Sequence, residues 1–227
     1  MPELIRSLKN LRYRLFYGAL LRRANLLELG NRGTGCSWFF CPDGLNRDSV
    51  VYGGGVGRDI TFEHALAKRF ECKVVLFDPS PTGAETMALA ENKIPQFHFV
   101  PVGLAGSNCT LRFAPPPDLK EGSWYTDGGS GATIEVPCVD LTTLMKQNGH
   151  NRIDLLKIDI EGAEYDVIDH ILGNKLRVCQ VLVEFHHNIL PGIPRSKSIS
   201  YILKMVRAGY KLLSQDGANH TFYNPSI

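Results

Sequence analysis

The alternation of short apolar runs with helix-patterned segments constrains the fold of this chain most. Five runs rich in β-branched and aromatic residues predict strands at 50–52, 73–77, 97–102, 153–158 and 180–185. Segments 61–70 and 82–92 between them predict helices, and the second begins with the capping-box pair Thr82 and Glu85. This order is typical of a mostly parallel sheet with helices on both faces, so we expect an α/β, Rossmann-like fold.

The end of the chain predicts a helix and then an antiparallel β-hairpin. Apolar residues at helical spacing from Ile199 stop at Gly209, and the runs 210–213 and 220–223 flank the turn Asp216-Gly217. Dinucleotide-binding dehydrogenases continue instead with further parallel units, so the hairpin disfavours that class.

Two regions are expected along the chain. Residues 1–46 would hold a basic amphipathic helix with leucines at 4, 8, 11 and 15, followed by an irregular loop over 30–46. In the simplest interpretation this helix packs on the domain and exposes its arginines to water, and weak contact with an acidic membrane surface or an acidic partner is the alternative. Residues 47–227 would form one domain, with an insertion at about 103–139 that carries a hairpin of 111–113 and 133–136.

Composition excludes several classes of protein. Lys plus Arg is 25 and Asp plus Glu is 23, so the net charge of +2 gives no reason to expect nucleic-acid binding. The six cysteines lack zinc-finger or redox spacing, and apolar stretches near the start are too short to span a bilayer. We therefore expect reduced thiols, a cytoplasmic protein and no transmembrane segment.

A glycine-rich turn follows the first expected strand and predicts a cofactor site. Glycines here permit a close approach of backbone to ligand, and the next helix offers its free amides to an anion. The third glycine of the dinucleotide fingerprint is missing, which counts against NAD. The candidate contacts in this turn are Tyr52, Gly53, Gly55, Gly57 and Asp59.

Asp78 ends the second strand about twenty residues later, where an acid can accept the hydroxyl protons of an adenosine ribose. We expect Pro79, Val102 and Gly103 to line the same cofactor site. The alternative role of Asp78 is to cap the following helix.

Candidate catalytic residues follow the fourth and fifth strands. Asp159 and Glu161, then Glu184 and His186, should meet at the edge of the sheet where open parallel sheets bind ligands. They could hold a cationic ligand, remove a proton from a hydroxyl or bind a divalent metal; the metal is not favoured, because the ligand spacing is ambiguous. Helix capping explains Glu164 most easily.

These motifs together resemble the FkbM family of S-adenosylmethionine-dependent methyltransferases. The resemblance spans roughly residues 38–224 and rests on the glycine turn, Phe-Asp-Pro-Ser at 77–80, Leu-Leu-Lys-Ile-Asp-Ile-Glu-Gly-Ala-Glu at 155–164 and Val-Glu-Phe-His at 183–186. It implies S-adenosylmethionine as cofactor and methyl transfer to a hydroxyl oxygen. Matched positions are Gly53, Gly55 and Gly57 in the turn, Asp78 as the ribose acid, and Asp159 with Glu161 as the acidic pair.

One departure from the family pattern leaves alternatives open. The family commonly has an acid at the end of the first strand, where this chain has Val51, Tyr52 and Gly53, and Asp59 is the nearest acid. A nicotinamide-dependent oxidoreductase and a noncatalytic module with a methyltransferase fold are the alternatives. The expected acceptor is a small molecule or glycan, with Trp124 and Tyr125 in the loop 115–131 as its wall.

Overall fold

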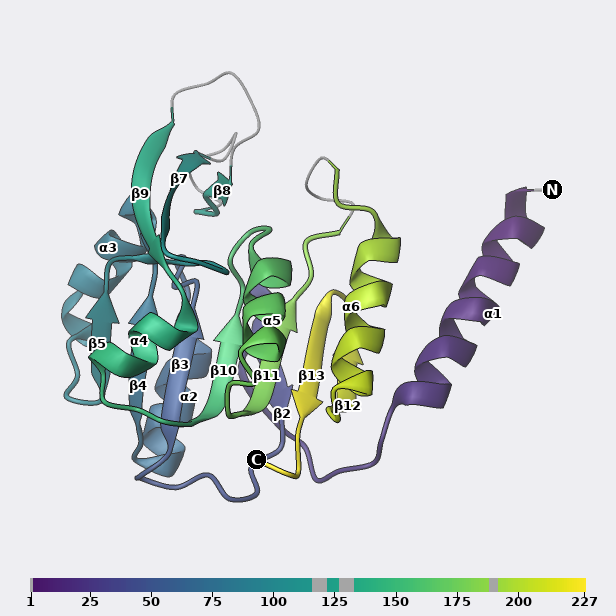
Figure 1. Ribbon diagram of the computed structural model, residues 1–227, viewed down its shortest axis with the longest axis horizontal. Helices are drawn as coiled ribbons and strands as arrows, with labels where there is room; N and C mark the ends of the chain where they lie inside the picture. The colour runs from purple at the N-terminus through teal and green to yellow at the C-terminus, as the bar shows by residue number, and fades with distance from the viewer. Residues whose placement is uncertain (1, 116–121, 127–132, 188–191) are drawn as a thin grey trace.

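The chain forms a seven-stranded sheet in the order β12-β13-β11-β10-β3-β4-β5 (Figure 1). The structure is a computed structural model that describes residues 2–115, 122–126, 133–187 and 192–227. The pairs β11–β10, β10–β3, β3–β4 and β4–β5 are parallel, whereas β13 runs antiparallel to both β11 and β12. The strands are β3 (Val50–Gly54), β4 (Lys73–Phe77), β5 (Phe97–Val100), β10 (Ile153–Ile158), β11 (Val178–Glu184), β12 (Lys211–Asp216) and β13 (Asn219–Tyr223).

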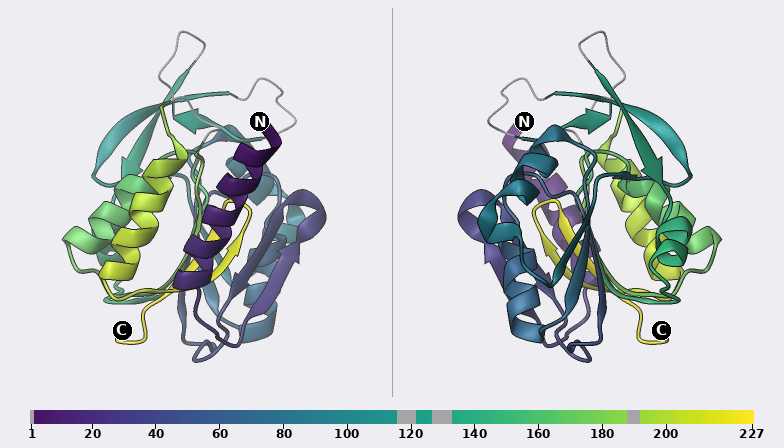
Figure 2. Two further views of the ribbon diagram at one scale, coloured as in Figure 1. Left: turned by 90° about the vertical axis from the view of Figure 1, so that its right-hand side faces the viewer. Right: turned by 90° about the vertical axis from the view of Figure 1, so that its left-hand side faces the viewer.

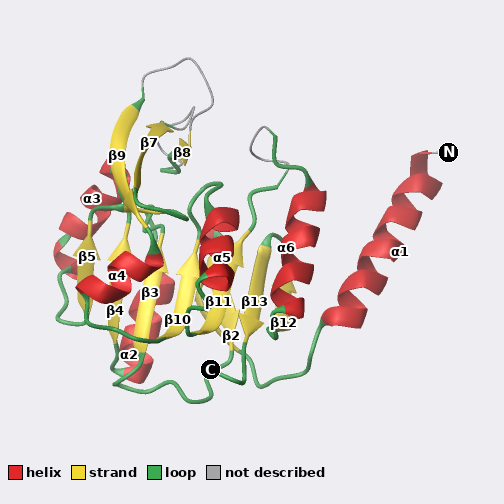
Figure 3. Cartoon of the chain, in the orientation of Figure 1, coloured by secondary structure: helices red, strands yellow, loops and turns green. Residues whose placement is uncertain are grey.

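This architecture confirms the expected fold class, including the terminal hairpin. Helices α4 (Leu141–Gln147), α5 (Glu164–Gly173) and α6 (Arg195–Arg207) cover one face of the sheet, and α2 (Thr61–Phe70) and α3 (Pro81–Ala88) cover the other (Figures 2 and 3). Each face has its own apolar core: Leu141, Ile168 and Ile202 belong to the first, and Phe62 and Leu66 to the second. Burial of these side chains on both faces is what makes the strand sequences nearly continuously apolar.

One expected helix start differs from the structure. The cap of α3 is Ser80, whose hydroxyl accepts a hydrogen bond from the amide of Gly83 at 3.0 Å, so the helix begins before Thr82. The reason is Pro81, whose fixed φ suits the first helical position. Helix α5 ends at Gly173, and Lys175 adopts the left-handed conformation beyond it. Asp140 caps α4, its side chain accepting a hydrogen bond from the amide of Thr143.

The expected irregular entry loop is an antiparallel hairpin of β1 (Leu27–Asn31) and β2 (Cys36–Phe40), joined by the 3₁₀ turn Arg32–Thr34. Its aromatic residues Trp38 and Phe40 are buried against Phe62 of α2. The sequence pattern missed the hairpin because Gly30, Gly33 and Gly35 suggest only a loop, whereas two of them take the positive φ values that the turn needs.

A small second sheet, order β6-β9-β7-β8, lies beyond the ends of β3 and β4 (Figure 1). It consists of β6 (Gly103–Leu104), β7 (Cys109–Ala114), β8 (Tyr125–Thr126) and β9 (Ile134–Val139). The expected hairpin is its β7–β9 pair, with Leu111 opposite Val136. A short 3₁₀ turn, Ala90–Asn92, leads towards β5.

Helix α1 (Pro2–Leu20) lies at the β12 edge of the molecule. It packs through Tyr13, Phe16, Tyr17 and Leu20, whereas Leu11 and Leu15 of the leucine stripe are exposed. Two of these aromatic residues contact the neighbouring elements: Tyr17 hydrogen-bonds to His220 of β13, and Arg195 of α6 lies over the ring of Tyr13. Within the described residues, no helix has the length and apolar content needed to cross a membrane.

Candidate functional site

A cavity of about 390 Å³ lies at the carboxyl ends of β3, β4, β10 and β11, under the second sheet. This is the edge where open parallel sheets bind their ligands. Most of the residues that the sequence singled out line it together: Gly55, Gly57, Asp59, Asp78, Pro79, Gly103, Asp159, Glu161, Glu184 and His186.

Three candidate cofactor contacts lie outside the cavity lining. The Tyr52 ring is fully buried in the core, where its hydroxyl is 2.9 Å from Nδ1 of His150. Gly53 faces Leu76 and Glu63 beneath the turn, and Val102 packs at the margin of the core. Successive side chains of a strand point to opposite faces of the sheet, and helices cover both faces here. The residues of β3 before the glycine turn are therefore buried in the core and do not reach the cavity.

The glycine turn is held by Asp78. Oδ2 accepts hydrogen bonds from the amides of Val56 at 2.8 Å and Gly57 at 3.0 Å, and Oδ1 accepts one from the amide of Ser80. This carboxylate therefore has a structural role besides any contact with ligand hydroxyls, which would use its remaining lone pairs.

Glycine is required at position 55 because the backbone there lies in close contact with Asp159, the residue that follows β10. Its φ is 85°, and a Cβ there would lie 1.8 Å from the carbonyl oxygen of Asp159. The turn can thus lie directly against the residues that follow β10, which brings the cofactor turn and the acidic pair into one cavity.

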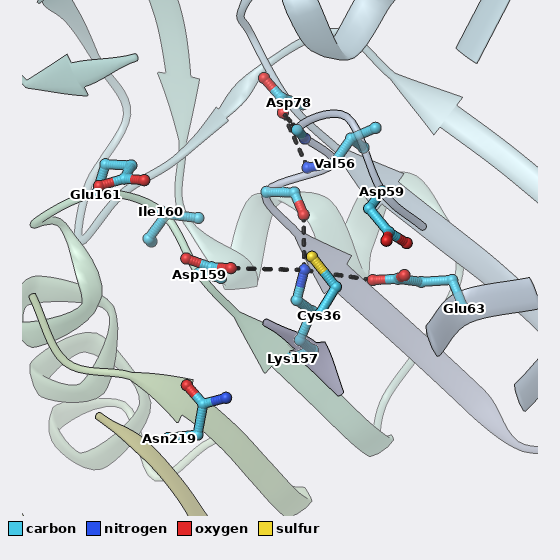
Figure 4. A network of polar contacts seen from close by, with 12 residues as sticks. Cys36, Val56, Asp59, Glu63, Asp78, Lys157, Asp159, Ile160, Glu161 and Asn219 are labelled. Carbon is cyan, nitrogen blue, oxygen red and sulfur yellow. Dashed lines mark hydrogen bonds and ion pairs between the residues drawn. The ribbon is translucent and has the colours of Figure 1, made fainter. Parts of the chain in front are cut away.

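Lys157 links these parts from below (Figure 4). Its Nζ donates to the carbonyl oxygen of Gly55 at 2.8 Å and lies 3.4 Å from Oε1 of Glu63 and 4.0 Å from Oδ2 of Asp159. Burial alone would lower the pKa of Lys157, but the carboxylates of Glu63 and Asp159 outweigh it and raise the pKa above its usual value. The buried lysine therefore remains charged and connects β10, α2 and the glycine turn.

Asp59, the acid nearest to the departure from the family pattern, binds protein groups. Oδ1 accepts from the amide of Thr61 at the start of α2, and Oδ2 accepts from the hydroxyl of Thr34 at 2.6 Å. Burial acts to raise the pKa of Asp59, but the hydrogen bonds from Thr34 and Thr61 lower it overall. Asp59 thus joins the β1–β2 hairpin to the cavity rim.

His186 lies among three carboxylates. Nδ1 is 2.7 Å from Oε1 of the fully buried Glu164, and Nε2 lies 3.2 Å from Oε2 of Glu161 and 3.5 Å from Oδ1 of Asp159. Burial would lower the pKa of His186, but Glu164 and then Glu161 and Asp159 raise it to about 10. At neutral pH the ring is an imidazolium, so it has no lone pair with which to accept a proton.

Two carboxyl groups beside His186 have raised pKa values, which makes them stronger proton acceptors. Burial, reinforced by the charge of Asp159, raises the pKa of Glu184 to about 7. Burial also raises the pKa of Glu161, whose backbone has the left-handed φ of 54°. Non-glycine residues adopt this conformation at a cost of about 1 kcal/mol or more, and such strain concentrates at functional sites.

Asp159, Glu184 and His186 also form the one cluster of the described residues that could hold a metal ion, with one ligand atom from each within 4.8 Å of the others. A divalent ion would compete with the proton on Nε2 of His186, because a ligating imidazole must be neutral at the bound nitrogen.

Sequence reasoning missed several cavity or supporting residues. Glu164, attributed to helix capping, accepts from the amides of Ile160 and Gly162 but is also the ion-pair partner of His186. Glu63 and Lys157 gave no signal beyond being charged residues in apolar surroundings. Trp124 and Tyr125 line the cavity as expected, and Trp124 donates to the hydroxyl of Thr82; most of the loop 115–131 lies outside the described residues.

The sequence is similar to known proteins. Residues 29–212 match the family model described as methyltransferase FkbM domain. The human protein named probable methyltransferase-like protein 24 is 25% identical over 173 residues, which cover 75% of this chain and 40% of that protein. This chain therefore spans well under half of the human relative.

Among solved structures, an rRNA methylase from Streptococcus thermophilus is similar with a TM-score of 0.44 and 10% identity, covering 79% of this chain and 89% of that one. Fibrillarin from Methanococcus jannaschii is similar with a TM-score of 0.42 and 11% identity, covering 88% and 80%. The fold assignment itself rests on the strand order and directions of the main sheet.

Proposed function

Because the chain belongs to the FkbM family of S-adenosylmethionine-dependent methyltransferases, we propose that it methylates a hydroxyl oxygen of a small-molecule or glycan acceptor. The observation that carries this proposal is the cluster of Asp159, Glu161 and Glu184 around His186, in the same cavity as the glycine turn. The family membership also favours methyl transfer over the alternative of a nicotinamide-dependent oxidoreductase.

The cavity residues fit the cofactor. In this proposal Gly57, where an added Cβ would meet nothing within 4 Å, leaves room for a ligand beside the turn, and Asp78, which lines the cavity, accepts the ribose hydroxyls through its remaining lone pairs. The acidic groups Asp159 and Glu161 complement a sulfonium cation. In this proposal Asp59, already bound to Thr34 and Thr61, contributes at the rim rather than as the main contact of the methionine amine.

The bound cofactor supplies a methyl carbon activated by positive sulfur, so the protein has to align the acceptor oxygen and exclude water. Glu184, with its pKa of about 7, accepts the hydroxyl proton at neutral pH. The imidazolium of His186 holds Glu161 and Asp159 in place and offsets their mutual repulsion. Trp124 and Tyr125 form one wall for the acceptor.

The charge of the cavity limits the acceptor. Carboxylates outnumber the cations Arg58, Lys157 and His186 in its lining, and Lys157 is already paired with Glu63. A neutral polyhydroxylated acceptor fits this lining better than a phosphorylated one, and nucleic acid is disfavoured on the same ground. A cytoplasmic location belongs to the same proposal and is supported by six free thiols.

The deciding experiment is calorimetric titration with S-adenosylhomocysteine, with NADH in parallel and with magnesium or a chelator in repeat runs. We expect micromolar-range binding of adenosylhomocysteine alone, unchanged by either addition. Binding of NADH alone would contradict the proposal, and a strict need for magnesium would assign Asp159, Glu184 and His186 to a metal.

The acceptor is then sought by transfer of a labelled methyl group to neutral sugars and alcohols, with phosphorylated counterparts as matched controls. Label on a neutral hydroxyl supports the proposal. Cofactor binding without transfer to any acceptor would favour a noncatalytic module that keeps the methyltransferase fold.

A further inference from the structure

Helix α1 has two apolar faces, and the body of the protein covers one of them. The covered face carries Tyr13 and Tyr17: the Tyr17 hydroxyl is 2.7 Å from Nε2 of His220, and the guanidinium of Arg195 lies 4.0 Å from the Tyr13 ring centre. These contacts fix how the helix is rotated about its axis. In Figure 1, α1 is the outermost element at the right-hand edge of the molecule, and in the left view of Figure 2 the same helix faces the viewer.

The other face presents leucines to solvent. Leu11 is 53% exposed and Leu15 is 65% exposed, and Leu21, just past the helix, is 37% exposed. Among the side chains that the structure describes, which exclude those of residues 1–10, Leu89 is the one other large apolar side chain with such exposure. Leu11 and Leu15 continue the spacing that the sequence begins at Leu4. Contiguous exposed apolar side chains of this kind mark an interaction surface.

Basic residues surround this leucine face. Arg12 and Arg14 are exposed on the helix, and Arg22 and Arg23 are exposed directly after it. Between residues 4 and 27 the sequence contains Lys and Arg but no Asp or Glu. An apolar stripe flanked by cations is the pattern of helices that lie in the interface of an anionic bilayer.

We propose that the exposed leucine face of α1 binds the surface of an anionic lipid bilayer. Leu11 and Leu15 enter the boundary between headgroups and acyl chains, and Arg12 and Arg14 contact lipid phosphates and carboxylates. Pairing with a second copy fits less well, because it would bring the two arginine sets together without any acidic residue in the segment to neutralise them. This inference is independent of the methyl acceptor.

The test is cosedimentation of the full chain with vesicles of phosphatidylcholine alone, or of phosphatidylcholine and phosphatidylserine in equal parts. We expect binding to the anionic vesicles, weakened by salt. Leu11→Gln with Leu15→Gln should lower the partition coefficient about tenfold or more. Arg12→Gln with Arg14→Gln should lower it about 25-fold, since each cation near an anionic leaflet contributes about fivefold.

The matched controls are Leu89→Gln, an exposed leucine elsewhere, and Lys68→Gln with Arg69→Gln, two exposed cations on α2. The proposal is supported if the control variants bind the anionic vesicles as well as the unmodified chain does, while the leucine and arginine variants show the expected losses. Equal binding to both vesicle types, no binding, or the same loss in the controls would overturn it. So would a lipid-free dimer that the leucine variants dissociate, because a second copy would then be the occupant. Arg12 and Arg14 are both exposed, so the result for the arginine variant holds even if the leucine variants unfold.

Discussion

The charge on His186 is the residue-scale property with the clearest consequence for stability. Its folded-state pKa of about 10 lies above the ordinary 6.5, so its contribution to the free energy of unfolding is complete below pH 6.5 and is lost as the pH rises towards 10. Between about pH 6 and about pH 9 we expect a loss on the order of 2–3 kcal/mol, measured by urea unfolding. His186→Gln should remove this pH dependence, while His98→Gln, at an exposed position, should keep it. Parallel pH profiles for both variants would contradict the assigned charge.

Glu184 should determine how turnover depends on pH. With a pKa of about 7, its carboxylate form becomes available as the pH rises through neutrality, so turnover should rise over the same range. Glu184→Gln should lower kcat by about 10² to 10³ and flatten the profile. Glu85→Gln, an exposed position on α3, serves as the control, measured by steady-state kinetics across pH. A variant that keeps the rise would exclude Glu184 as the proton acceptor.

Asp78 is expected to support cofactor affinity in two ways. Asp78→Asn removes a charged acceptor from the ribose position and weakens the hydrogen bonds that hold Val56 and Gly57. The dissociation constant of adenosylhomocysteine should rise by about tenfold or more, measured by calorimetry. Asp48→Asn, an exposed acid before β3, should leave it unchanged. Equal affinities in the two variants would remove Asp78 from the cofactor site.

Some residue roles could be predicted from the sequence, and others depend on partners that only the fold brings close. Asp159, Glu161, Glu184 and His186 follow buried strands, so their meeting at one sheet edge was predictable from strand order. The charge of His186 was not predictable, because it depends on Glu164, a residue whose position in the sequence indicates only a role in capping the helix.

At the scale of elements, the buried pair of Lys157 and Glu63 ties β10 to α2. Lys157→Met leaves the carboxylate of Glu63 buried with its cation removed, which should destabilise the protein by about 3–5 kcal/mol. Adding Glu63→Leu removes that buried charge, so the double variant should be more stable than Lys157→Met alone. Chemical unfolding of the four proteins of this cycle gives the coupling energy. Additive effects would mean that the two side chains act independently.

Element boundaries were predictable where local chemistry alone decides them. Strands β4 and β10 and helix α2 match the predicted bounds because apolar runs and flanking polar residues coincide. The β1–β2 hairpin was not predictable in this way, since its strands are held by burial of Trp38 and Phe40 against α2 rather than by a strong alternating pattern. The predicted start of α3 was wrong because two capping patterns overlap at Ser80 and Thr82.

At the scale of the whole molecule, α1 and the glycine turn lie at well-separated positions in the order of the main sheet. The helix contacts β12 at one edge, and β13, β11 and β10 separate that strand from β3 and its glycine turn. The sequence predicted the helix but not its rotation, because two apolar stripes compete for the domain and the aromatic one fills the available space. Because Tyr17 is buried, the helix stabilises the fold in addition to presenting its exposed leucine face.

Deletion of residues 1–23 tests this separation of roles. The deletion exposes His220, which is now buried and hydrogen-bonded to Tyr17 and whose pKa is lowered to about 4 by burial. We expect a lower Tm, by about 4 °C or more, consistent with the loss of at least 1–2 kcal/mol of buried aromatic contact. The affinity for adenosylhomocysteine should stay within about twofold of the full chain at a temperature where both are folded. Tyr17→Phe, which removes the hydroxyl alone, should lower the Tm less than the deletion does. Loss of cofactor affinity in a folded deletion variant would show that the β12 edge and the cavity are coupled after all.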